Sequence, residues 1–236
     1  MIPHKLTLCL LFLLSLQVTG LSQKKPPSGG RLGVVVDERL AALRATPQLN
    51  GKLVRRLSRG RLVAIRSFNT SDGVTFLLVN VSSRTHGWIQ REAVVSPSRS
   101  GDDRRLLTLI QRSTGFDRLA RARIFLDHFP RSPVRPEVLL LLGDTAESLA
   151  EKLSLDAARR LKDDLGDAPE FSYYLNYTGL DRYNRQRVGF VFDRTTKRFH
   201  YEGAAWRELI RRYPKTSQAA EARKRVGLLY SQLRMK

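Results

Sequence analysis

The sequence predicts a multidomain chain of the β plus α class, with a small β-barrel over residues 32–96 and an α-helical domain over residues 103–236. Short apolar runs that end at Gly, Ser and Asp turns fill the first part. After residue 102 the apolar residues recur at helical spacing. Two segments rich in Pro, Gly and Ser, residues 21–31 and 97–102, are predicted as linkers because they cannot build a core.

The N-terminus predicts a secretory signal peptide over residues 1–20. Met1–Lys5 carries one Lys, Leu6–Val18 is an apolar run of thirteen residues, and the Thr19-Gly20 step ends it as a cleavage site would. The run is too short to cross about 30 Å of hydrocarbon as a helix. We therefore expect an exported protein of the periplasm or cell envelope, cleaved at about residue 20, with only peripheral membrane contact.

The composition argues against several kinds of chemistry. Cys9 is the only Cys and lies in the apolar run, so the exported part has no disulfide, thiolate metal site or Cys nucleophile. His86, His128 and His200 are not at metal-ligand spacing. The chain has no Gly-rich phosphate loop and no G-x-S-x-G nucleophile motif. The sequence thus predicts a protein that is not an enzyme and that uses no cofactor and no metal.

The net charge is strongly positive and spread along the chain. The formal value is +20, from 42 Lys and Arg against 22 Asp and Glu, and 32 of the basic residues are Arg. This excess predicts either attraction to an anionic partner, such as cell-wall polymer, lipid headgroups or nucleic acid, or a bias toward Arg on solvated helix faces. Export counts against nucleic acid as the partner.

The β part is expected to consist of short strands separated by turns. Ser58-Arg59-Gly60 and Asn69–Gly73 supply the turn residues. Gly87 permits a close backbone approach beside a bulky ring. Trp88 can then either pack in the core or form an aromatic floor for a peptide or glycan. The expected strands are residues 32–36, 52–57, 61–68, 74–80 and 85–95.

Several of these residues follow a known order along the chain, namely Leu43-Arg44, then Val54 and Leu57 before the Ser58-Arg59-Gly60 turn, then Val63 and Ile65, then Gly87-Trp88-Ile89. Over about 64 residues this order resembles the bacterial SH3 (SH3b) domain family. Leu78-Val79 departs from the pattern, because many members carry an aromatic residue there. The resemblance implies a module that binds cell-wall peptide or a protein partner, with Trp88, His86 and Arg44 as candidate ligand-binding residues.

The α part contains an internal repeat. Phe129-Pro130-Arg131-Ser132 recurs 84 residues later as Tyr213-Pro214-Lys215-Thr216, and Gly143 recurs as Gly227. In each copy an aromatic-Pro step ends one helix and a Ser or Thr caps the next. The pattern resembles the tetratricopeptide (TPR) repeat, which implies protein–protein interaction. The expected helices are residues 104–112, 116–129, 136–153, 155–165, 202–213 and 217–233.

An aromatic- and Arg-rich insertion over residues 171–201 separates the two repeats, and a hairpin is expected at residues 188–201. Aromatic rings mixed with Arg are typical of stacking on, and recognition of, anionic ligands. The same rings could instead attach the insertion to the helices while the arginines face water. The candidate ligand-binding residues of the insertion are Tyr183, Arg185, Phe199 and Tyr201.

Together these features predict an exported, non-enzymatic binding or scaffold protein of the cell envelope. Its β module would bind cell-wall peptide or a protein, and its helices would contact another protein. The alternative is a protein that binds polyanions or nucleic acid through the Arg and aromatic insertion. That alternative predicts an affinity that falls steeply with salt.

Overall fold

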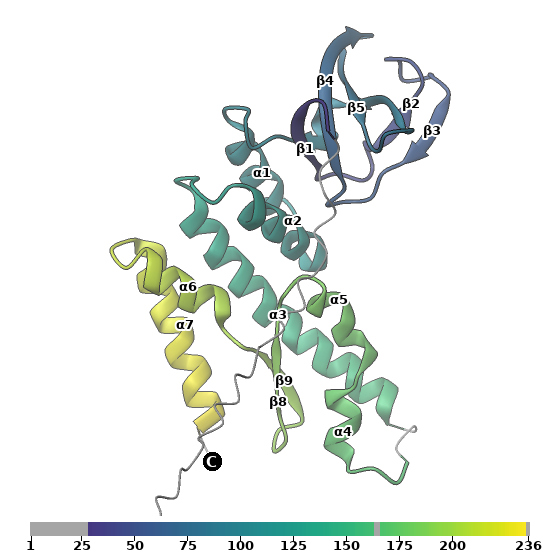
Figure 1. Cartoon of the computed structure of the whole chain (residues 1–236). Coiled ribbons are helices and arrows are strands. Elements are labelled where there is room, and N and C mark those ends of the chain that lie inside the picture. The colour runs from purple at the N-terminus through teal and green to yellow at the C-terminus, as the bar shows by residue number, and fades with distance from the viewer. Residues whose placement is uncertain (1–27, 163–165, 235–236) are drawn as a thin grey trace, which may run out of the picture.

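The computed structural model describes residues 28–162 and 166–234, so the predicted signal peptide lies outside the described residues. The described chain is mixed β and α, as predicted: an antiparallel seven-stranded sheet is followed by helices and a two-stranded hairpin (Figure 1). The strand order in the large sheet is β3-β2-β6-β5-β4-β1-β7. Because its edge strands do not pair with each other, the sheet is open where the sequence predicted a barrel.

The sheet is built from strands of two to ten residues. A two-residue turn joins β4 to β5, with φ of 54° at Asp72 and 73° at Gly73, and Ser71 pairs with Val74 across it. This is the Asp-Gly turn that favours a tight hairpin. The strands are β1 (Arg31–Val35), β2 (Ala42–Arg44), β3 (Leu53–Arg56), β4 (Leu62–Ser71), β5 (Val74–Asn80), β6 (His86–Gln90) and β7 (Val94–Val95), with a 3-10 turn η1 (Arg91–Ala93) before β7.

The helical part contains one helix of 27 residues, α3, where the sequence predicted two helices. Ser154 lies at the predicted break, but its hydroxyl donates to the Ala150 carbonyl at 2.7 Å and the helix continues through it. The elements of this part are α1 (Asp102–Gln111), α2 (Gly115–His128), α3 (Arg135–Leu161), α4 (Glu170–Leu175), η2 (Thr178–Leu180), α5 (Asp181–Asn184), β8 (Phe190–Asp193), β9 (Arg198–Tyr201), α6 (Ala204–Arg212) and α7 (Ser217–Arg234).

The predicted repeat corresponds to two helix pairs, α2–α3 and α6–α7. Both first helices end in the same way: the Phe129 amide donates to the Phe125 carbonyl at 2.8 Å, and the Tyr213 amide donates to the Leu209 carbonyl at 2.9 Å. Proline then follows each aromatic residue and cannot continue the helix. The repeated end of the first helix is therefore present in the structure, but the predicted cap is present in only one copy. Thr216 accepts the Ala219 amide at 3.2 Å at the start of α7, whereas α3 follows Val134 with no side-chain cap.

Successive valines at the end of β1 pack in two different hydrophobic cores, one inside the sheet and one shared with the helices. Val35 packs inside the sheet, whereas Val34 and Val36 pack with α1, α2 and α3 in a single cluster that also includes Val95 of β7. This alternation follows from the two-residue period of a strand. As Figure 1 illustrates, α1 and α2 are the helices nearest the sheet.

Arg121 of α2 forms a buried hydrogen bond between the helices and the residue that follows strand β1. The residue is only 6% exposed, and its guanidinium donates to the Val36 carbonyl at 3.1 Å and to the Ser113 hydroxyl at 2.6 Å. Asp37 lies 3.9 Å from the same guanidinium. A buried guanidinium needs such acceptors, because leaving it unpaired is costly.

Within residues 28–162 and 166–234, no helix combines the length and apolar character needed to cross a bilayer.

Candidate functional site

The three site residues predicted in the sheet lie on one face of it. Trp88 pairs with Arg44 across β2–β6 and with Leu78 across β5–β6, and His86 lies two residues along the same strand. Side chains two residues apart, and those directly opposite, share a face. His86 is exposed and Trp88 and Arg44 are half-buried. The fold thus brings these three predicted residues together.

The backbone approaches closely at Gly87, as the sequence predicted. A Cβ atom there would lie 2.6 Å from the Arg44 carbonyl oxygen and 3.0 Å from Leu43 Cγ. The adjacent Arg44 side chain has a partner within the chain, because its Nη1 donates to the Gly51 carbonyl at 2.7 Å. Arg44 therefore supports the loop between β2 and β3, and Trp88 is a half-buried aromatic side chain on this face.

The aromatic residues predicted for the insertion are in the core. Tyr183, Phe199 and Tyr201 are 4%, 2% and 1% exposed. Phe199 packs against Phe192 with ring centroids 5.2 Å apart. Burial raises the pKa of Tyr201 to about 12, and the Ala205 amide donates to its hydroxyl at 2.7 Å. These rings attach the insertion to α3 and α6, which is the structural alternative considered from sequence.

Two arginines of the insertion stack on aromatic rings of the same chain. Arg182 stands over the rings of Phe116 and Tyr183 at 4.6 and 4.7 Å, and Arg194 stands over Phe171 at 3.9 Å. Arg185, the fourth predicted residue of this segment, is exposed. The stacking expected with a ligand is thus made largely within the chain.

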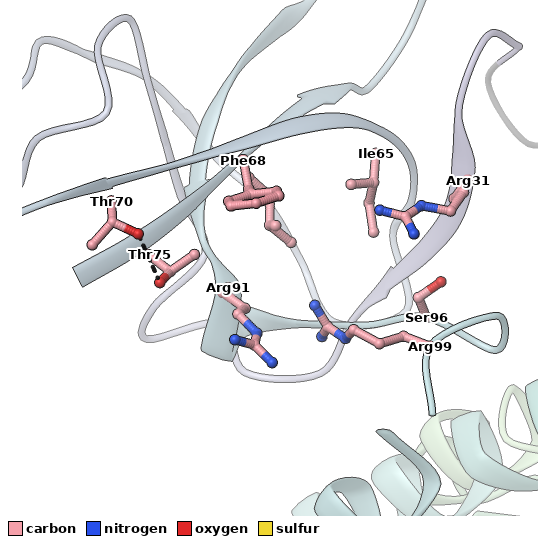
Figure 2. A pocket seen from close by; sticks show the side chains of 9 residues that line it. Arg31, Ile65, Phe68, Thr70, Thr75, Arg91, Ser96 and Arg99 are labelled. Carbon is pink, nitrogen blue, oxygen red and sulfur yellow. Dashed lines mark hydrogen bonds between the residues drawn. The ribbon is translucent and has the colours of Figure 1, made fainter. Parts of the chain in front are cut away.

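A cavity of about 240 Å³ opens between the β4–β5 hairpin and the segment that follows β7 (Figure 2). Its apolar wall consists of Ile65, Phe68 and Leu77, and Thr70, Thr75 and Ser96 contribute hydroxyls. Phe68 is 70% exposed, the highest value for a large apolar side chain among the described residues. An aromatic ring left in water at a cavity is an apolar contact surface for a ligand.

Three arginines complete the cavity, and no acidic residue lines it. Arg31 comes from β1, Arg91 from the turn after β6, and Arg99 from the segment before α1. In Figure 2 the guanidinium groups of Arg91 and Arg99 are turned toward the same space, opposite Phe68, with Arg31 at the edge. The cavity therefore combines positive charge with an aromatic surface.

Arg99 is held rigidly by Asp102 at the start of α1. Its Nε donates to Asp102 Oδ2 at 2.9 Å and its Nη2 to the Val94 carbonyl at 3.2 Å. Asp102 is 3% exposed and also accepts the Ser96 amide at 2.7 Å. The segment predicted as a linker, residues 97–102, is consequently fixed at both ends by buried hydrogen bonds.

Arg31 and Arg91 differ from Arg99. Both are exposed, and the guanidinium group of neither makes a hydrogen bond or ion pair to any residue in the described part of the chain. Free guanidinium groups with fixed planar geometry are suited to a carboxylate or phosphate. Within residues 28–162 and 166–234, no group of three His, Cys, Asp or Glu side chains is placed to hold a metal ion.

The cavity residues were missed by sequence reasoning. Arg31, Phe68, Arg91 and Arg99 are far apart in the chain and belong to no motif. The available signal was weak: Phe68 was read only as the end of a strand, whereas β4 continues to Ser71 and the Phe68 ring is exposed. The cavity and Trp88 lie on opposite faces of β5, since Leu77 lines the cavity and its neighbour Leu78 pairs with Trp88.

Comparison with known proteins gives no match to a family model, a curated protein or a solved structure.

Proposed function

We propose that this chain is an exported, non-enzymatic binding protein of the cell envelope that recognises a carboxylate-bearing peptide in the arginine cavity of its sheet. The observation that carries the proposal is the cavity itself: three arginines and an exposed Phe68 line it, and no acid does. Each charge-assisted hydrogen bond to a guanidinium is worth about 1.5–3 kcal/mol. Cell-wall peptide and acidic protein segments share this chemistry.

In this proposal the sheet is an SH3b-like module and the two helix pairs are TPR-like. The order of the motif residues and the close approach at Gly87 support the first assignment. The matching hydrogen bonds at Phe129 and Tyr213 support the second. The sheet would bind the peptide, and the helices would act as a scaffold attached to it through Arg121 and the shared core.

The test is retention of the purified protein on isolated cell-wall sacculi at about 0.05 M and 0.5 M salt, because salt screens exposed charges. A double variant, Arg31→Gln with Arg91→Gln, removes the two unpaired cavity cations. Arg55→Gln with Arg56→Gln is the matched control, since it removes the same charge from exposed positions on β3.

We expect the cavity variant to bind at least about tenfold more weakly at high salt, because two charge-assisted bonds are lost, and the control to bind like the parent protein. Soluble wall peptides with amidated carboxylates should bind as weakly as the cavity variant does. Equal retention of both variants at high salt would refute the cavity as the site.

The polyanion alternative keeps one supporting observation, the net charge of +20. It predicts that both double variants weaken binding equally and that the logarithm of the affinity falls linearly with the logarithm of the salt concentration. That result in the same assay would favour non-specific charge attraction over peptide recognition.

A further inference from the structure

The two repeat glycines, Gly143 of α3 and Gly227 of α7, stand at equivalent positions but have different surroundings. A Cβ atom on Gly143 would lie 2.6 Å from Cδ1 and 2.7 Å from Cε2 of Trp206. A Cβ atom on Gly227 would have no described atom within 4 Å. One glycine is thus covered by a ring and the other is open.

The covered glycine shows how a helix docks on this face. Trp206 projects from α6 onto Gly143, is 2% exposed, and donates its indole N–H to Asp144 Oδ1 at 3.2 Å. The missing side chain of Gly143 is what lets the ring approach the α3 backbone. In this repeat the glycine is the point on the helix surface against which a side chain of the next helix packs; we call such a position the floor of the helix–helix contact.

The open glycine has apolar neighbours on both sides. Leu228 is 58% exposed and Tyr230 is 46% exposed. At 3.6 residues per turn they flank Gly227 on opposite sides of the exposed surface of α7. At the equivalent position on α3, the space above Gly143 is filled by the Trp206 ring. Figure 1 places α7 at the outer end of the helical part, beside α6.

We propose that the Gly227 face of α7 docks an acidic amphipathic helix of another protein, which inserts one large apolar side chain between Leu228 and Tyr230. The model for this occupant is the chain's own α6, whose Trp206 occupies the equivalent position on α3. The inserted side chain needs no hydrogen-bond acceptor, because Leu228 stands where α3 has Asp144.

Charge selects an acidic partner. Arg223 and Lys224 are exposed on α7 where α3 has Leu139 and Leu140. The surface pair between Lys224 and Glu221 at 2.8 Å is too weak to neutralise this charge. A second copy of the chain is disfavoured as occupant, because each copy carries a net charge of +20 and the two would repel.

The probe is a synthetic helical peptide of about 16 residues based on α6, with Trp206 replaced by Phe and its arginines replaced by Glu. Binding to the purified protein is measured by fluorescence anisotropy. A second peptide with Ala in place of the Phe keeps every charge and so controls for attraction to the basic chain.

Gly227→Leu fills the floor, and Gln232→Leu is the matched control because it lies about 140° around the same helix and is also exposed. Circular dichroism checks that both variants fold. We expect Gly227→Leu and the Ala peptide each to weaken binding at least about tenfold, the loss of roughly one buried apolar contact. Gln232→Leu should bind like the parent.

Absence of saturable binding, or equal binding of the Phe and Ala peptides, would overturn the proposal. Unchanged binding by Gly227→Leu would overturn it as well. Because Gly227→Leu leaves the arginine cavity intact, loss of binding in that variant separates docking on α7 from the proposed peptide recognition by the sheet.

Discussion

At the two repeat glycines the same substitution, Gly→Ala, should change the free energy of unfolding in opposite directions. Gly143 and Gly227 both lie inside helices, so Gly→Ala should add about 1 kcal/mol of helix stability at either position if nothing else changes. Gly227 has open space for the methyl group. We therefore expect Gly227→Ala to raise the free energy of unfolding by about 0.5–1 kcal/mol.

At Gly143 the methyl group meets the Trp206 ring at 2.6 and 2.7 Å. The ring cannot simply swing away, since it is 2% exposed and packs edge-on against Tyr201 with centroids 5.3 Å apart. Forcing an extra methyl into a packed core costs about 1–3 kcal/mol. Weakening the hydrogen bond from Trp206 to Asp144 costs about 1 kcal/mol more. After the gain in helix propensity, Gly143→Ala should lose about 1–3 kcal/mol.

Urea unfolding followed by far-ultraviolet circular dichroism measures both variants, and Trp fluorescence reports the ring in Gly143→Ala. The decisive quantity is the difference between the two variants, about 2–4 kcal/mol by the sum of these terms. If Gly143→Ala and Gly227→Ala changed the free energy of unfolding by the same amount, the account of Trp206 packing on α3 would be refuted, and the argument for an open Gly227 would lose its template.

Two further predictions concern polar groups. In urea unfolding, Arg121→Met should lower the free energy of unfolding by about 2–4 kcal/mol, because the Val36 carbonyl and the Ser113 hydroxyl would each lose a buried donor. A loss below about 0.5 kcal/mol would contradict the role of Arg121 between the sheet and the helices. The hydrogen bond from Tyr177, together with arginines on α3, lowers the pKa of Asp156 to about 2. The contribution of this carboxylate to stability is therefore present above about pH 4 and is lost as the pH falls toward 2. We expect Asp156→Asn to be less stable at pH 7 and to lose less stability between about pH 4 and pH 2, and an acid unfolding profile like that of the parent would contradict this role of Asp156.

Much of the fold could be predicted because its elements have clear periods. Helices expected at residues 116–129 and 217–233 are found at Gly115–His128 and Ser217–Arg234. The apolar stripe and the Pro after each first helix carried that information. The break placed near Ser154 was wrong, since a Ser hydroxyl that bonds back to the helix and also accepts the Phe199 amide at 2.8 Å leaves the helix intact. Strand β2, three residues long, is too short for any alternation to show.

The site was harder to predict than the fold. Trp88, Arg44 and His86 were predicted as candidates from the order of the motif residues, and the structure places them together on β2 and β6. Phe199 and Tyr201 were predicted as candidate ligand-binding residues, but both are buried. An aromatic residue in a sequence does not reveal whether its ring faces solvent or a helix. Burial by α3 and α6 decided that question. The cavity residues belong to no local motif, because only the pairing of β1, β4 and β5, together with the position of the segment before α1, brings them together.

The position of Asp102 links the proposed binding cavity to the helices. This one buried carboxylate holds Arg99 in the cavity, accepts the Ser96 amide at the end of the sheet, and lies in the first turn of α1. An acidic residue is favourable there because the N-terminus of a helix carries partial positive charge. A peptide carboxylate that approached Arg99 would therefore bind beside a group whose partners span both parts of the chain. Because Val34 of β1 and Val95 of β7 also share a buried core with α1 and α2, a ligand in the cavity would bind next to the packed contact between the sheet and the helices.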